Sequence, residues 1–204
     1  PPHPPLPLEP APDLVVHSLT KALSGHGDAI GGVVAGNHDR IGAVRELVVK
    51  GFGGVLAPFN PYLIARGIKT LALRQRQACE SALAIAEFLA ASAAIVGVHY
   101  PGLRSHPGHA IAKRQMRAFG SLVAFELRGG LDAGRRLLDR VELITHAVSL
   151  GDVRSLITHP ASTTAANVPA EVRAQAGIGD GLLRLSVGIE DAPDLIADLS
   201  QALA

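Results

Sequence analysis

Short apolar runs alternate with amphipathic stretches along most of the chain, which predicts alternating strands and helices. The first run, Asp13–His17, is rich in β-branched residues and is typical of a strand buried in a parallel sheet. A polar, glycine-rich loop follows it, and a second apolar run, Ile30–Ala35, closes that loop. Asn37 or Asp39 then offers a cap for a helix that continues to about Lys50, where glycines end it.

A long helical stretch comes next and predicts a bridge between two lobes. It covers Pro58 to about Ser92, with a break near Gly67, and apolar residues of its second part recur every three or four positions. After it the pattern predicts strands at 95–99, 121–127, 143–150 and 182–188, and a loop over 152–167. Helices are predicted at 109–117, at 132–141, from about Pro169, and from Asp191 to the C-terminus with Pro193 in the first turn. The strands and helices do not keep a regular βαβ rhythm, so we expect an α+β C-terminal part.

Composition narrows the classes of protein that fit. The chain has 204 residues, of which 48% are hydrophobic and 18% charged, enough to bury a substantial core. The net charge is +1 with no basic stripe, which argues against a nucleic-acid partner. No apolar run approaches the roughly 20 residues that span a bilayer, so we expect a cytoplasmic protein with no membrane contact. The single Cys79 excludes an intrachain disulfide and a multi-cysteine zinc site.

The loop after the first strand carries the most informative group of polar residues. Ser18 and Thr20 are hydroxyl donors suited to a phosphate, and Lys21 lies beside them at the end of an apolar strand. The lysine has two functional interpretations, a cationic phosphate partner or an amine that forms a Schiff base with a carbonyl cofactor. The alternative is a solvated surface lysine. The chain contains no P-loop spacing.

Two further residues invite a functional interpretation. Ser149 stands at the edge of an apolar run before a glycine, and Arg184 is embedded in the apolar run 182–188. An arginine buried in a strand is costly unless an anion pairs with it, and its planar guanidinium fits a carboxylate. The alternative is a structural ion pair with Glu190 or Asp191.

The nine histidines do not form a metal-binding pattern. His106 and His109 are separated by Pro-Gly, so they are not a helical pair of zinc ligands. We expect His26 and His159 to form hydrogen bonds within loops, Cys79 to pack or lie at the surface, and no metal site.

Six segments of the chain resemble segments of the Cys/Met-metabolism family of pyridoxal-phosphate-dependent enzymes, and they occur in the same order along the chain. These are Asp13–Asp28 around the lysine, Arg66–Leu71, His99–Leu103, Ala147–Asp152, His159–Thr164 and Leu183–Asp191. The resemblance runs from about residue 7 onward, and within the family it is strongest to the methionine γ-lyases, notably through Gly129–Arg136. It implies the C-terminal part of a fold-type I enzyme, mixed α/β and α+β: residues 1–72 would be a remnant of the cofactor-binding domain and 73–204 a C-terminal α+β domain.

The resemblance also implies a role for each matched residue. Lys21 would hold pyridoxal 5′-phosphate as a Schiff base and shuttle protons, and Ser18 and Thr20 would bind the cofactor phosphate. Ser149 and Arg184 would hold the substrate α-carboxylate. The implied reaction is α,γ-elimination from a sulfur amino acid to give a thiol, a 2-oxo acid and ammonia. The alternatives within the family are cystathionine γ-lyase, cystathionine γ-synthase and O-acylhomoserine sulfhydrylase.

The resemblance has gaps that bear on activity. Family members are about twice as long, and the implied aspartate, stacking aromatic, phosphate-binding turn and neighbouring-subunit residues would all lie upstream of Lys21. Ala22 and Ala165 stand where the family has an aromatic residue and a histidine, and no acidic residue lies at Lys50–Gly51. Seven prolines in residues 1–12 favour an extended start. We therefore expect a C-terminal fragment of an enzyme whose intact relatives are dimer-built tetramers, and the alternative of another class is an inert fragment or interaction module with exposed apolar edges.

Overall fold

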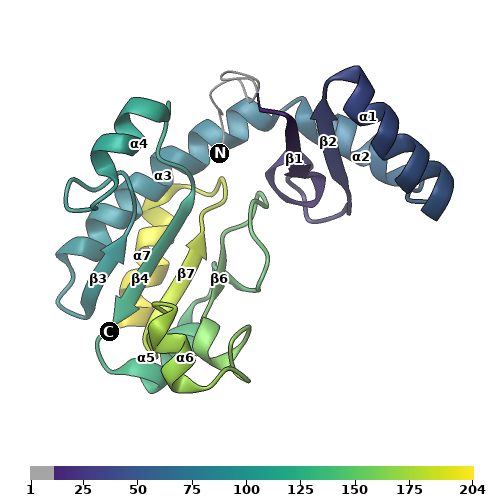
Figure 1. Cartoon of the computed structure of the whole chain (residues 1–204). Coiled ribbons are helices and arrows are strands. Elements are labelled where there is room, and N and C mark those ends of the chain that lie inside the picture. The colour runs from purple at the N-terminus through teal and green to yellow at the C-terminus, as the bar shows by residue number, and fades with distance from the viewer. Residues whose placement is uncertain (1–11) are drawn as a thin grey trace.

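The computed structural model describes residues 12–204, and it contains two separate sheets (Figure 1). The proline-rich stretch predicted to be extended lies outside the described residues, apart from Pro12. The smaller sheet pairs β1 (Leu14–Ser18) with β2 (Gly32–Gly36). The larger has five strands in the order β3-β4-β7-β6-β5. In the confirmed α/β fold the lysine-bearing loop follows a strand of the small sheet, whereas Arg184 is on β7 (Leu182–Ser186) of the large sheet and Ser149 lies between its strands β5 and β6.

The small sheet is antiparallel, so the prediction of a parallel-sheet strand at Asp13–His17 is wrong. The backbone N–H groups of Leu19 and Thr20 both donate to the Gly31 carbonyl, at 2.9 and 3.3 Å, which turns the chain back beside β1. Both strands keep an open edge within the described residues, and Val16 is 74% exposed. The exposed apolar edges expected from the sequence are thus present in this part of the molecule.

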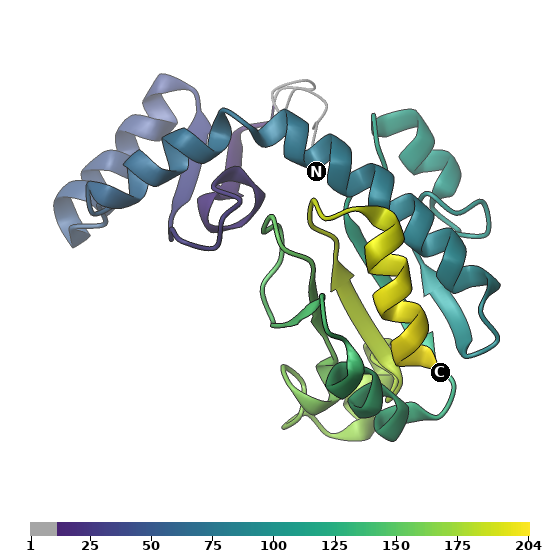
Figure 2. The same ribbon diagram turned by 180° about the vertical axis from the view of Figure 1, so that it is seen from behind.

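The helices after β2 follow the sequence prediction closely. In α1 (His38–Val44), Asn37 Oδ1 accepts from Arg40 N–H at 3.0 Å, and the helix continues as the wide turn η2 (Arg45–Gly51). Helices α2 (Phe59–Ile68) and α3 (Leu71–Ala91) meet near the predicted break. Figures 1 and 2 show α3 running from the small sheet along the large one.

The large sheet is formed by four of the predicted segments and one that was missed. Strands β3 (Ile95–His99), β4 (Leu122–Leu127) and β7 (Leu182–Ser186) confirm predicted strands and pair antiparallel. Strand β6 (Leu156–Thr158) lies between β7 and β5 (Thr145–His146), although residues 152–167 were predicted to be a loop. Only two residues of the predicted strand 143–150 are in the sheet. The N–H groups of 142–144 donate to the Asp198 carboxylate instead.

One face of the large sheet packs against helices to form the core (Figure 2). Helix α3 lies beside α7 (Ala192–Leu203), and α5 (Gly130–Arg140) packs against α7 and β4. The short helices α4 (His109–Gln115) and α6 (Ala170–Gln175) lie in the connections. Helix α7 begins after Asp191 as predicted, although the Asp191 side chain forms no capping hydrogen bond. Within the described residues, no helix is both long and apolar enough to cross a membrane. Fully buried core residues include Ile85, Leu89, Phe125, Leu183, Leu185, Leu195 and Leu199.

Candidate functional site

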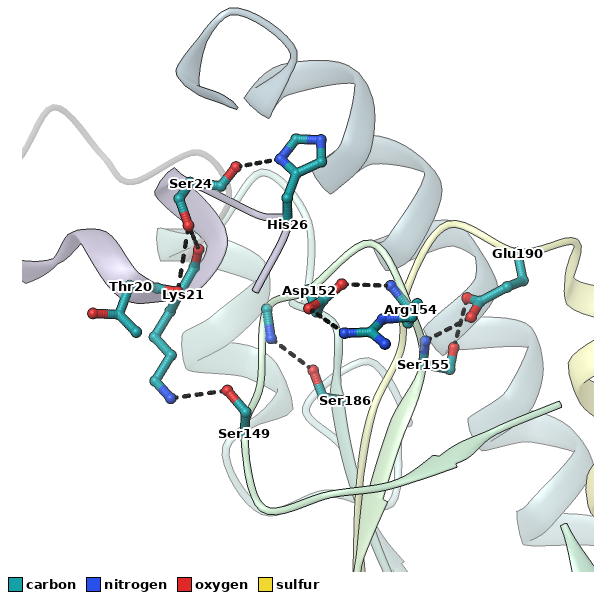
Figure 3. A network of polar contacts seen from close by, with 11 residues as sticks. Thr20, Lys21, Ser24, His26, Ser149, Asp152, Arg154, Ser155, Ser186 and Glu190 are labelled. Carbon is teal, nitrogen blue, oxygen red and sulfur yellow. Dashed lines mark hydrogen bonds and ion pairs between the residues drawn. The ribbon is translucent and has the colours of Figure 1, made fainter. Parts of the chain in front are cut away.

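Lys21 lies in η1 (Leu19–Leu23), a π-helical turn directly after β1. Its backbone angles, φ −94° and ψ −135°, interrupt the helical geometry of that turn. Its carbonyl accepts from Gly25 N–H at 2.9 Å, while Ser24 N–H donates to the Leu19 carbonyl at 3.1 Å. The turn therefore fixes the lysine backbone from both sides and directs its side chain toward the large sheet (Figure 3).

The amine of Lys21 reaches Ser149, which lies 128 residues further along the chain. Lys21 Nζ donates to Ser149 Oγ at 3.0 Å, and both side chains are half-buried (Figure 3). The backbones also meet, because Gly151 has φ +76° and a Cβ there would lie 2.6 Å from the Ala22 nitrogen. Val153 N–H then donates to the Gly25 carbonyl at 2.8 Å. The structure thus brings together two residues that the sequence singled out separately.

Arg184, on β7, completes this group of residues. One terminal nitrogen of its guanidinium donates to the Val148 and Ser149 carbonyls, at 2.7 and 3.1 Å. Its Nε is buried and has no hydrogen-bond partner among the described residues. Among the described residues, Arg184 forms no ion pair with either alternative partner, Glu190 or Asp191. The Glu190 carboxylate accepts from Ser155 N–H and Oγ–H instead. A buried, unsatisfied N–H on a guanidinium is costly and is suited to an anion such as a carboxylate.

The two hydroxyl residues before Lys21 differ in their surroundings. Ser18 is exposed at the end of β1, and its side chain makes no capping hydrogen bond to the turn. Thr20 Oγ1 donates to the Gly31 carbonyl at 3.2 Å and accepts from Gly31 N–H at 3.0 Å. A phosphate could therefore take the Ser18 hydroxyl directly, whereas the Thr20 proton would first have to leave Gly31. The phosphate-binding role of both residues stays a prediction.

Comparison with known proteins decides the family of this chain. The model of the Cys/Met metabolism PLP-dependent enzyme family matches residues 2–204. The chain belongs to that family. The enzymes of this family depend on pyridoxal 5′-phosphate, and the resemblance predicted from the lysine loop and the five later segments is confirmed.

Relatives within this PLP-dependent family are similar over nearly the whole chain. An L-methionine gamma-lyase of Pseudomonas putida is 50% identical over 97% of this chain and 50% of its own length. One from Fusobacterium nucleatum subsp. polymorphum is 48% identical with the same coverage. A cystathionine gamma-lyase of Dictyostelium discoideum is 47% identical and is covered over 51% of its length. The chain thus spans about half the length of the curated relatives it matches.

A solved structure supports the same assignment. The crystal structure of cystathione gamma lyase (CalE6) from Micromonospora echinospora matches with a TM-score of 0.91 and 44% identity, over 97% of this chain and 52% of that one. The predicted fold, part of a mixed α/β PLP-dependent enzyme, is confirmed by this likeness.

The residues present fit one side of a bound pyridoxal phosphate. The half-buried Lys21 amine can react with its carbonyl, Ser18 offers a hydroxyl near the lysine, and the buried Arg184 Nε offers a site for the carboxylate of an amino acid. Lys21, Ser18, Thr20, Ser149 and Arg184 are therefore the candidate cofactor and substrate residues of this chain.

Several buried polar residues that hold the site together were missed from the sequence. Ser186 Oγ accepts from Gly151 N–H at 2.9 Å, and Ser155 Oγ accepts from Gly188 N–H at 2.9 Å while donating to Glu190 (Figure 3). They fix the segment that carries Ser149. The one sequence signal for Ser186 is a hydroxyl inside the otherwise apolar run 182–188.

His26 and His159 form hydrogen bonds within loops, as the sequence predicted. His159 is buried and bonds Ser162 Oγ and the Asp180 carbonyl, at 2.9 and 2.7 Å, and His26 Nδ1 lies 2.7 Å from the Ser24 carbonyl. In the described part of the chain, no three His, Cys, Asp or Glu side chains are grouped as metal ligands. Cys79 is buried in α3, and burial raises the pKa of its thiol.

Proposed function

We propose that this chain provides the lysine side of a pyridoxal-phosphate-dependent lyase site that acts on a sulfur-containing amino acid. Lys21 is the covalent attachment point, Ser18 and Thr20 bind the cofactor phosphate, and Ser149 and Arg184 bind the substrate α-carboxylate. The observation that carries the proposal is the contact of Lys21 Nζ with Ser149 Oγ beside the unpartnered Nε of Arg184.

When bound, pyridoxal phosphate supplies a carbonyl that condenses with amines and a ring that withdraws electrons from the bonds at the substrate Cα. Arg184 would direct the α-carboxylate through its free Nε, because its terminal nitrogen is already fixed on Val148 and Ser149. That orientation would bring the Cα–H bond near the Lys21 amine, which can accept the proton and return it at a neighbouring carbon. Before the proton transfer, Ser149 Oγ positions the Lys21 amine by accepting its hydrogen bond at 3.0 Å.

The reaction we propose is α,γ-elimination of the methionine γ-lyase type. One methionine and one water would give one thiol, one 2-oxo acid and one ammonia. Six curated relatives named L-methionine gamma-lyase are 48–50% identical to this chain, which supports this choice. The cystathionine lyases and the cystathionine gamma synthase among the relatives support the same site on a related substrate.

The division of the chain at residues 72 and 73 belongs to this proposal. The lysine loop and small sheet lie before it, and the large sheet with Ser149 and Arg184 lies after it. A catalytically inert chain or interaction module is the second candidate, favoured by the Thr20 hydroxyl, which is already hydrogen-bonded to Gly31. Homo-oligomeric assembly also remains a proposal.

A spectroscopic titration tests the cofactor role. Pyridoxal phosphate is added to the 204-residue chain, and the visible band of covalently attached cofactor is recorded against concentration. We expect a saturable band in the wild type and in Lys69→Ala, which removes an exposed lysine at the end of α2. The band should be absent in Lys21→Ala. A band of equal size in a folded Lys21→Ala variant would refute the proposed role, and absence of the band in a folded wild type would favour the inert chain.

A further inference from the structure

We propose that Arg74 is a positioning residue that holds the Lys21 turn in the geometry in which the lysine amine contacts Ser149. The proposal rests on the proposed function, since it concerns the placement of the same lysine. Arg74 lies on α3, 52 residues beyond the carbonyl that it binds in the turn.

The guanidinium of Arg74 joins three backbone or side-chain acceptors from separate segments. One terminal nitrogen donates to the Ala22 carbonyl at 3.0 Å, and the other donates to the Gly67 carbonyl at 2.8 Å. Nε donates to Thr70 Oγ1 at 3.1 Å. Ala22 follows Lys21 directly, so Arg74 ties the lysine turn to the end of α2 and the start of α3 through hydrogen bonds from a charged donor.

Two glycines provide the space that this arrangement requires. Gly25 has φ +76°, and a Cβ there would lie 1.9 Å from an Arg74 terminal nitrogen. A Cβ at Gly67 would lie 2.0 Å from the Ser24 carbonyl oxygen. The turn and α2 therefore approach each other closely only because both positions lack a side chain.

Burial separates Arg74 from an ordinary helix arginine. Arg74 is 6% exposed, whereas Arg76, two residues further on, is exposed. Burial lowers the pKa of the Arg74 guanidinium, and the nearby carboxylate of Asp152 opposes that shift. An arginine remains charged at neutral pH, so α3 carries a buried cation whose acceptors are mainly carbonyl oxygens of the lysine turn and α2. This fits a role in fixing backbone rather than in binding solvent.

The consequence for the site concerns where the lysine amine lies. Lys21 departs from helical geometry inside the turn, and its carbonyl and amine are bound by Gly25 and Ser149. Without Arg74, the Ala22 carbonyl loses its partner from α3, and the turn can shift relative to the segment that carries Ser149. We expect pyridoxal phosphate then to react with Lys21 with less preference over the other lysines of the chain.

The first measurement follows amide hydrogen exchange of the chain without cofactor. The amides of Ser24 and Gly25, both hydrogen-bonded within the turn, serve as probes. In Arg74→Gln we expect their exchange to accelerate by about tenfold or more, the effect of losing roughly one charge-assisted hydrogen bond. Amides of β4 and β7 should be unchanged. Arg76→Gln is the matched control on the same helix and should leave all of these amides unchanged.

The second measurement is the distribution of covalently attached cofactor over the lysines, which depends on how Lys21 is positioned. The chain is reacted with pyridoxal phosphate, reduced with borohydride, and its four lysines, Lys21, Lys50, Lys69 and Lys113, are mapped for the label. We expect the ratio of label on Lys21 to that on the other three to fall about tenfold in Arg74→Gln. Arg74→Lys, which keeps the charge but not the forked geometry, should restore part of the ratio. A purely structural role for Arg74 would lower the overall stability without changing this ratio.

The outcomes separate the proposal from the function on which it rests. If wild-type Lys21 shows no preference over the other lysines, the proposed function fails, and the exchange of Ser24 and Gly25 still decides the role of Arg74. Unchanged exchange in a folded Arg74→Gln overturns the proposal. If that variant does not fold, Thr70→Val decides, because it keeps Arg74 and removes the Nε acceptor together with the hydrogen bond from the Thr70 hydroxyl to the Gly67 carbonyl. Faster exchange in the turn supports the role of Arg74, and unchanged exchange overturns it.

Discussion

Removal of one buried hydroxyl, in Ser186→Ala, should weaken the connection between the large sheet and the segment that carries Ser149. Ser186 is fully buried, and its Oγ accepts from Gly151 N–H at 2.9 Å. The substitution leaves that buried N–H without an acceptor, which costs about 1–3 kcal/mol. Because the volume removed is a single oxygen atom, the lost hydrogen bond accounts for most of this cost.

Urea unfolding followed by circular dichroism measures the loss. With a urea dependence of about 2 kcal/mol per molar, the midpoint should fall by about 0.5–1.5 M. Ser200→Ala, an exposed serine on α7, is the control, and it should keep or slightly raise the midpoint because alanine favours helix. If the two variants have the same midpoint, the reasoning that the Gly151 amide depends on Ser186 is refuted.

Three other perturbations test separate parts of the structure. Burial opposes ionisation of Asp198, but hydrogen bonds from the N–H groups of 142–144 and from a glutamine lower its pKa below the usual 3.8. Its contribution to stability is therefore present above that usual value and is lost as the pH falls through the lowered pKa, so Asp198→Asn should have a lower Tm at pH 7 and a smaller loss of Tm on acidification. Gly67→Ala should lower the Tm, since its Cβ would lie 2.0 Å from a carbonyl oxygen of the lysine turn, whereas Gly42→Ala, with open space around it, should raise the Tm; equal shifts would contradict the close approach. Methionine bound at Arg184 should protect Lys21 from labelling by pyridoxal phosphate and borohydride. In Arg184→Lys, the methionine concentration that gives half-maximal protection should rise about tenfold, because a lysine at position 184 cannot present the planar guanidinium fork to the carboxylate. An unchanged concentration would mean that the carboxylate binds elsewhere.

Local pattern was sufficient for elements whose apolar residues face one surface. Strands β3, β4 and β7, helix α7 and the end of α3 were predicted within one or two residues, because the apolar residues that mark them form the buried core. The run 143–150 has the same apolar character, yet two of its N–H groups donate to Asp198 and two of its carbonyls accept from Arg184. Those partners lie 35 to 55 residues away along the chain, so no local pattern could reveal them.

The candidate site shows the same limit. Lys21, Ser149 and Arg184 could be named because a lysine beside hydroxyls and an arginine in an apolar strand are unusual, and because each lies in a segment that resembles the family. Arg74 could not be found this way. On the sequence it is one of two arginines of α3, and its burial depends on the close approach of two glycines from other segments. Likewise, β6 has three residues, too short a run to separate from a loop without its neighbours in the sheet.

Mapping of the borohydride-reduced cofactor over the four lysines of the folded wild-type chain tests the central claim most directly. If Lys21 is the attachment point of the cofactor, it should carry most of the label. Methionine at saturating concentration should then reduce the label on Lys21, because the lysine amine and the Arg184 Nε belong to one site. Label spread evenly over Lys21, Lys50, Lys69 and Lys113, with no protection by methionine, would contradict it.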